Sequence, residues 1–258
     1  MRIVVLLKEV PDTYGERTLD LETGIVERNR SERVLDEIGE RALEAALSYA
    51  DRHPGTEVEV LSMASEAASA TIRKALAIGA SRAVHVVDTA LVGADLGLTA
   101  EVLAAALRHN GFDLAIAGNQ STDGTGGVLP AMIAELLNVP HLTNIDSVEI
   151  AEQAVAGERA SDAGTMRISA ELPAIVSITE RMPEARFPNF KGIMAAKKKP
   201  LDTVTLADLD VDPEDPKAAR SIMLAIAERP PRAGGTMIVD EGDAGEKLAE
   251  YLIQNRLV

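Results

Sequence analysis

The chain has 258 residues, 46% of them hydrophobic, and a formal net charge of −15 at pH 7. This length allows one large domain, or a domain with an appendage, that buries a substantial core. With three Phe, three Tyr and no Trp, the core must be aliphatic, and an aromatic surface for stacking bases is not expected. The acidic charge also argues against nucleic acid as a partner. The absence of cysteine excludes disulfides, iron–sulfur ligation and thiolate chemistry in this chain.

The N-terminal sequence MRIVVLLKEVP contains only a short apolar run. Lys8, Glu9 and Pro11 end it, so neither a signal peptide nor a direct membrane insertion is expected. A cytoplasmic protein is the natural expectation.

The first half of the chain alternates between strand and helix patterns. Aliphatic runs typical of buried strands lie at 3–7, 58–61, 83–87 and 113–117. Amphipathic or alanine-rich helical patterns lie at 31–50, 65–78, 94–108 and 125–137. Gly79 is expected to end the second helix in a left-handed conformation, and Asn138 with Pro140 to end the fourth. This alternation predicts an α/β fold with a doubly wound, mostly parallel, Rossmann-like sheet of the adenine-nucleotide-binding type.

The pattern changes after Pro140. Strand-like segments at 145–150, 154–159, 166–172 and 174–178 predict an antiparallel extension, and residues 180–200 are expected to form an exposed loop. Farther on, DVDPEDP and ERPPRAGG resemble linkers that precede a helical pattern at 241–258. We therefore expect a nucleotide-binding domain at 1–200 and a C-terminal linker and arm at 201–258, lying against this domain or another subunit.

The segment AGNQSTDGTGGVLP, residues 117–130, is the first candidate site. It follows a predicted strand and leads into a helix, where parallel sheets bind ligands and helix N-termini attract phosphate. Gly124, Gly126 and Gly127 would allow close approach of a phosphate. The alternative is a simple tight turn in which Thr122 or Asp123 caps the helix. No Gly-Lys-Ser/Thr follows, which disfavours nucleoside triphosphate hydrolysis.

The segment at 186–200 is the second candidate. It places Phe187, Phe190, Ile193 and Met194 beside three lysines, a combination typical of a transient docking site. The alternative is that the apolar side chains pack back onto the domain and the lysines are only solvated.

No catalytic or metal-binding constellation stands out elsewhere. The four histidines occur singly, without metal-ligand spacing, and the acidic residues fall on solvated helix faces. We assign no metal site and no catalytic residue.

Six segments resemble the beta subunit of electron-transfer flavoproteins, the FixA-like family. They are IVVLLKEVPDT, LDEIGERALEAAL, TIRKALAIGASRAVHV, LAIAGNQSTDGTGG, LPAIVSI and RFPNFKGIMAAKKKP. The resemblance covers nearly the whole chain, and TIRKALAIGA and KGIMAAKKK are its most specific parts.

The resemblance implies a heterodimer in which an alpha subunit holds the redox-active FAD and this chain binds AMP. The chain would be an electron carrier subunit without catalytic residues of its own. Electrons from acyl-CoA or related dehydrogenases, as in fatty acid beta-oxidation, would leave through a membrane ETF-quinone oxidoreductase. The AMP site of the family carries over to Leu6, Asp36, Glu37, Ile38, Gly39, Met63, Gly118, Asn119, Gln120, Ser121, Thr122, Asp123, Gly124, Thr125, Gly126, Gly127, Val128 and Leu129.

The family's recognition loop matches residues 183–199. The implied docking residues are Phe190, Lys191, Gly192, Ile193 and Met194, with Phe190 where relatives often carry leucine. At Thr13 and Ile38 this chain lacks the aromatic residues that relatives often place near the flavin. The sequence leaves the identity of the dehydrogenase and of the acceptor open, as well as the flavin potential.

Two other functions remain as alternatives. Bifurcating relatives bind a second FAD in place of AMP and show DGDTAQVGP-like residues where this chain has DGTGGVLP, which favours AMP here. A stand-alone adenine-nucleotide-binding protein of the universal-stress type shares the architecture and would form a homodimer without flavin. The composition of the C-terminal linker favours an arm that packs on the partner subunit.

Overall fold

The computed structural model describes residues 1–232 and 234–258. The chain divides into two compact units, Met1–Leu224 and Ala225–Val258. Ala233, in the expected linker ERPPRAGG, lies outside the described residues.

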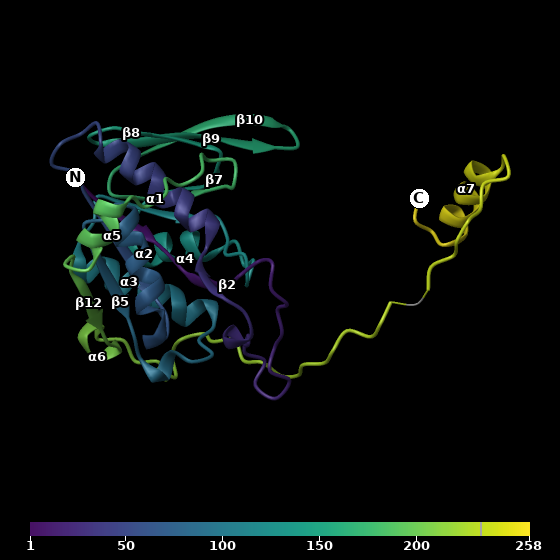
Figure 1. Cartoon of the computed structure of the whole chain (residues 1–258), viewed down its shortest axis with the longest axis horizontal. Coiled ribbons are helices and arrows are strands. Elements are labelled where there is room, and N and C mark those ends of the chain that lie inside the picture. Colours follow the sequence, from purple (N-terminus) through teal and green to yellow (C-terminus); the bar gives the residue numbers. More distant parts are fainter. Residues whose placement is uncertain (233) are drawn as a thin grey trace. The chain divides into compact units, whose positions relative to one another are not determined.

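Seven parallel strands form the central sheet of the first unit, in the spatial order β12-β5-β4-β1-β6-β11-β7 (Figure 1). They are β1 (Arg2–Leu6), β4 (Glu57–Met63), β5 (Arg82–Val86), β6 (Leu114–Gly118), β7 (His141–Ile145), β11 (Ala174–Ile178) and β12 (Leu201–Val204). The aliphatic runs of β1, β4, β5 and β6 are buried on both faces, as the sequence predicts for parallel strands.

Helices cover both faces of this sheet. One core cluster joins it to α1 (Glu37–Ala50) and α2 (Ser69–Ile78), and a second joins it to α3 (Leu96–Asn110), α4 (Leu129–Leu137) and α6 (Leu206–Leu209). Within β1, Ile3 and Val5 face the first cluster and Val4 the second. The doubly wound fold is therefore confirmed. Short 3₁₀ turns lie at η1 (Arg28–Arg30), η2 (Glu66–Ala68) and η3 (Thr89–Leu91).

The expected antiparallel extension is present but has different members. It consists of β8 (Ser147–Ile150), β9 (Ala154–Ser161) and β10 (Gly164–Glu171), next to β7 at the edge of the main sheet (Figure 1). The segment 145–150 is divided at Asp146, where the chain leaves the parallel sheet. The strand at 174–178 is not part of the extension, because β11 inserts between β6 and β7 in parallel.

The structure also corrects several helix boundaries. The helix expected from residue 31 begins at Glu37, because β3 (Arg33–Leu35) pairs with β2 (Glu9–Pro11) instead. The helix expected from Thr125 begins at Leu129. As expected, that helix ends at Asn138, which adopts the left-handed region with φ of 55°. Gly79 does not adopt that region, since its φ of 165° is extended.

The first unit continues past the expected boundary at residue 200. Strand β12 pairs with β5, and α6 packs against α3, so residues 201–224 belong with the sheet. In the second unit the expected terminal helix is α7 (Ala244–Gln254), and none of its residues is buried among the described residues. No helix in the described part of the chain has the length and apolar character needed to span a bilayer.

The segment after residue 180 is not entirely loop, because α5 (Phe190–Ala196) forms within it. The Asn189 side chain caps this helix by accepting the Gly192 N–H at 2.8 Å. A Cβ at Gly192 would collide with the carbonyl oxygen of Ala77 in α2, so glycine allows α5 to lie closely on α2. Lys199 then donates to carbonyl groups at the end of α2, those of Leu76, Gly79 and Ala80 at 2.8, 3.2 and 2.6 Å.

We expect Lys199→Met to lower the free energy of unfolding by about 1–2 kcal/mol, because three carbonyl groups lose a charged donor. Lys198→Met removes the same charge from an exposed side chain one residue away, and should change stability by less than about 0.5 kcal/mol. Denaturant unfolding of both variants measures the difference. Equal stabilities would contradict the role given to Lys199.

Candidate functional site

The predicted site lies where the winding of the sheet reverses. Strands β1 and β6 are neighbours, with Leu6 beside Ala117, yet α1 and α4 lie on opposite faces of the sheet. The segments that follow the two strands therefore diverge and leave a crevice at the carboxyl edge, the usual ligand position in such sheets. Leu6, Met63 and Gly118, which end β1, β4 and β6, all lie along this edge.

Asp36 connects the two sides of the crevice. One carboxylate oxygen accepts the N–H groups of Ile38 and Gly39 at the start of α1, at 3.1 and 3.4 Å. The other accepts the N–H and the hydroxyl of Thr122, at 2.6 and 2.9 Å. Asp36 is only 3% exposed. With both oxygens accepting donors inside the protein, the Asp36 side chain positions the loop after β6.

Gly118 lets the start of α1 approach the end of β6. A Cβ there would lie 3.0 Å from Cγ2 of Ile38 and 3.3 Å from the carbonyl oxygen of Gln120. The side chain of Ile38 is buried in the core below, and Gly39 lies above Leu7. The structure thus brings residues 36–39 and 118–122 together, as the sequence predicts.

Asp123 is the second internal carboxylate of the loop. Its side chain is 5% exposed and contacts Lys8 at 2.7 Å and Arg28 at 3.2 Å. Burial alone would raise the pKa of Asp123, but hydrogen bonds and charge from Lys8, with further hydrogen bonds from Ser121 and Gly124, hold it below its ordinary value. The carboxylate is therefore charged at neutral pH.

The loop leaves a run of backbone donors free. Within residues 1–232 and 234–258, the N–H groups of Gly126, Gly127 and Val128 donate to no protein acceptor. They directly precede Leu129, the first residue of α4. Thr125 and Gly127 have left-handed φ values of 48° and 69°, which turn the chain at this point. Such donors at a helix start fit an anion.

The glycines of this loop have different roles. Gly127 needs its left-handed conformation, and a Cβ there would point into open space. A Cβ at Gly124 would have its nearest neighbour at 3.6 Å, and one at Gly126 would lie 3.4 Å from Leu96, which are ordinary contacts. Only Gly127 is therefore required by the conformation of the loop itself.

Among the predicted loop residues that the structure describes, Asn119 has the one buried side-chain atom without a hydrogen-bond partner. Its N–H donates to the carbonyl of Ile178 at 2.8 Å, while its Oδ1 is buried without a partner. Such an atom normally has a hydrogen-bond partner, so a ligand donor would complete it. Gln120 and Val128 are exposed, and Ser121 accepts from Lys8 at 3.3 Å.

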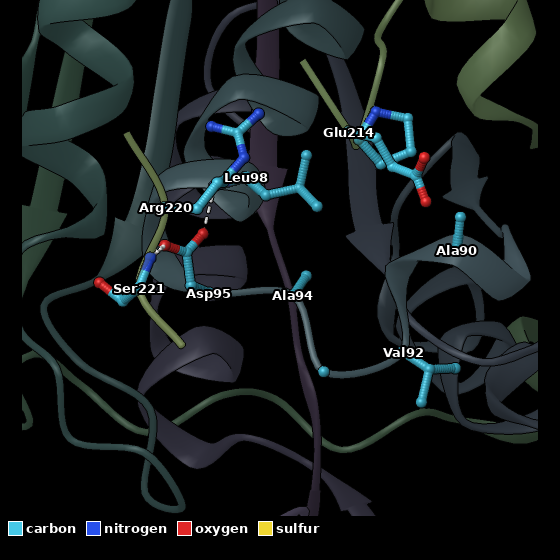
Figure 2. Close-up of a pocket in the computed structure, with 10 residues that line it drawn as sticks. Ala90, Val92, Ala94, Asp95, Leu98, Glu214, Arg220 and Ser221 are labelled. Atoms are coloured by element: carbon cyan, nitrogen blue, oxygen red, sulfur yellow. Dashed lines mark hydrogen bonds between the residues drawn. The ribbon is translucent and has the colours of Figure 1, made fainter. Parts of the chain in front are cut away.

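Two cavities lie near this edge of the sheet. One, of about 270 Å³, is lined by Thr122 and Glu37 together with Thr13 and Lys74, so it adjoins the predicted site. The other, of about 240 Å³, lies between the start of α3 and residues 213–221 (Figure 2). Its Asp95 accepts the N–H groups of Leu98 and Ser221, so this acid is already satisfied.

The expected docking residues are displayed by α5. Phe190 is 80% exposed, Ile193 and Met194 are about half exposed, and Phe187 before the helix is 93% exposed. Lys191 is also exposed. Gly192 differs from the others because it faces α2.

Lys8, Arg17 and Arg28 belong to the site but were absent from the sequence prediction. Arg17 donates to the carbonyl of Thr122, and the other two pair with Asp123. The only signal in the sequence is Lys8 itself, a cation directly after a buried strand of a very acidic chain.

Comparison with known proteins agrees with this architecture. A family model described as electron transfer flavoprotein domain matches residues 23–209. An electron transfer flavoprotein subunit beta of Mycobacterium tuberculosis (strain ATCC 25618 / H37Rv) is 42% identical over 263 residues, covering 99% of each chain. A protein of the same name from Bacillus subtilis (strain 168) is 34% identical over 83% of each chain. The caffeyl-CoA reductase-Etf complex subunit CarD of Acetobacterium woodii is 33% identical over 92% of each chain.

The Mycobacterium tuberculosis match extends over nearly the whole chain, and the family model includes residues 36–39, 118–129 and α5. The chain therefore belongs to the electron transfer flavoprotein family, as a beta subunit.

Proposed function

We propose that this chain binds AMP in the crevice at the end of β1 and β6 and forms a heterodimer with an alpha subunit that holds FAD. The complex would take electrons from acyl-CoA or related dehydrogenases in the cytoplasm and pass them to an ETF-quinone oxidoreductase. The chain itself would serve as scaffold and docking surface, without catalytic residues. The observation that carries the nucleotide assignment is the run of free N–H groups at 126–128.

The residues of the crevice fit AMP in two respects. The free N–H groups and the start of α4 suit a phosphate, whose charge is favoured by the helix dipole. The buried Oδ1 of Asn119 suits a donor from the base or the ribose. Leu6 and Met63, at the strand ends, would contact the nucleotide largely through their backbone.

Bound FAD would supply the redox chemistry, and it belongs to the alpha subunit. The residues of this chain would bind AMP, orient the flavin domain of the alpha subunit and cover it. The 270 Å³ cavity beside Thr13 and Glu37 opens next to the loop and is a candidate surface against the flavin domain. In the second unit, α7 has Leu248, Tyr251 and Ile253 partly or largely exposed, which fits an arm that packs on the partner subunit.

The display of Phe190 on a fixed helix supports the docking role. An exposed aromatic side chain on a rigid element loses little conformational entropy on binding and can fill a pocket of the partner. Lys191 adds a positive charge beside it, in a chain whose net charge is −15. The dehydrogenase would accordingly present an apolar pocket.

Phe190→Asp should raise the KM for the dehydrogenase about 30-fold, equivalent to about 2 kcal/mol of binding energy, because a charge would be buried at the anchor. Met166→Asp makes a comparable change on β10, away from α5, and should leave the KM unchanged. Steady-state reduction of the heterodimer by an acyl-CoA dehydrogenase gives both values. Unaltered reduction of the Phe190 variant would remove the anchor assignment.

Gly127→Ala should weaken AMP binding at least about fivefold, because the loop would relax from its left-handed conformation and binding would have to restore it at a cost of about 1 kcal/mol. Gly55→Ala is the matched control, since Gly55 has φ of 91° and equally open surroundings but lies outside the site.

Both variants should lose similar stability, while only the first should lose AMP. Isothermal titration of AMP into nucleotide-depleted heterodimer, with the melting temperature of each variant, makes the comparison. Equal AMP affinities would favour the simple tight turn.

A further inference from the structure

The side chain of Asp123 is a bridge between the N-terminal part of the chain and the loop after β6. It accepts Lys8 Nζ at 2.7 Å, Arg28 Nη2 at 3.2 Å and the N–H of Gly124 at 2.6 Å. Lys8 follows β1, and Arg28 lies in η1. The two cations therefore reach the loop from the opposite side of the crevice.

Asp123 lies at the point that determines the path of the loop. On one side, Thr122 is held by Asp36 and by Arg17, which donates to its carbonyl group. On the other side, residues 124–128 follow, and the free N–H groups belong to the last three of them. The orientation of these donors depends on where residue 123 is held.

A buried carboxylate remains in place only while its charge is paired. The side chain of Asp123 is 5% exposed, whereas those of Lys8 and Arg28 are 42% and 36% exposed. Loss of either cation would leave the buried carboxylate of Asp123 paired with one cation only. The carboxylate would then turn toward water. The loop would move with it.

The charges also leave an excess. Three cations (Lys8, Arg17 and Arg28) and two carboxylates (Asp36 and Asp123) meet at residues 122 and 123, which leaves one positive charge at this part of the loop in a chain of net charge −15. A phosphate next to this loop would meet a locally favourable potential.

We propose that Lys8 and Arg28 are positioning residues for the nucleotide: acting through Asp123, they hold the N–H groups of 126–128 in the arrangement that receives the phosphate of AMP. This inference rests on the proposed AMP function and extends it to residues of the N-terminal segment. It gives those residues a role that neither contacts with the alpha subunit nor docking requires.

The test measures AMP affinity by titration of nucleotide-depleted heterodimer. Lys8→Met and Arg28→Met are each expected to weaken binding about tenfold, and Lys8→Arg to stay within about twofold of the unmodified protein. The matched control is Arg167→Met, which breaks the exposed ion pair with Glu149 between β10 and β8 and should not alter AMP binding.

Asp123→Asn separates positioning from simple attraction. If the cations acted only by attracting phosphate, removal of the negative charge would tighten AMP binding. Positioning predicts weaker binding, because the loop loses its ionic anchor. Tighter binding by Asp123→Asn, or full affinity in both methionine variants, would overturn the inference while the AMP function stands. An unmodified heterodimer that binds no AMP would overturn both.

Discussion

The buried carboxylate of Asp36 is the interaction on which the site depends. One of its oxygens caps the N-terminus of α1, and the other accepts hydrogen bonds from Thr122. The helix after β1 and the loop after β6 therefore share one anchor. A carboxylate with four donors has little capacity left for a ligand. Its effect is to define the crevice between two segments that the doubly wound topology would otherwise separate.

The same principle recurs at both proposed binding surfaces: charged side chains hold the backbone, and backbone groups or apolar side chains are presented outward. At the crevice, Asp36 and Asp123 fix a loop whose N–H groups stay free. At α5, Lys199 and the close contact at Gly192 fix a helix whose Phe190 side chain stays exposed. Arg186 adds to this by pairing with Glu44 of α1 at 2.8 Å. Rigid presentation lowers the entropy lost on binding in both cases.

Much of the fold could be predicted from the sequence because burial on both faces leaves continuous aliphatic runs, and the strand–helix alternation sets the topology. The errors occurred where tertiary contacts override local pattern. Residues 33–35 have helical periodicity but pair with β2. Gly192 is a residue type that disfavours helices. It nevertheless lies within α5, because a Cβ at this position would collide with the backbone of α2. The sequence of strand β11 resembles those of β8, β9 and β10, which precede it and are antiparallel. Strand β11 instead inserts into the parallel sheet.

The position of the loop at the carboxyl edge of the sheet could also be predicted, since it follows from strand order and glycine content. The roles of its acidic residues could not. Asp36 and Asp123 look like ligand residues in the sequence, and only the structure shows that their oxygens are used internally. The pairing of Lys8 with Asp123 joins residues 115 positions apart, a separation that no local pattern reveals.

The most direct test of the account is the nucleotide content of the assembled protein. The chain is co-expressed with its alpha subunit, the complex is purified and denatured, and the released FAD and AMP are quantified by chromatography. The account predicts one FAD and one AMP per heterodimer. Two FAD without AMP would indicate a bifurcating complex, and a flavin-free homodimer would contradict the proposed assembly altogether.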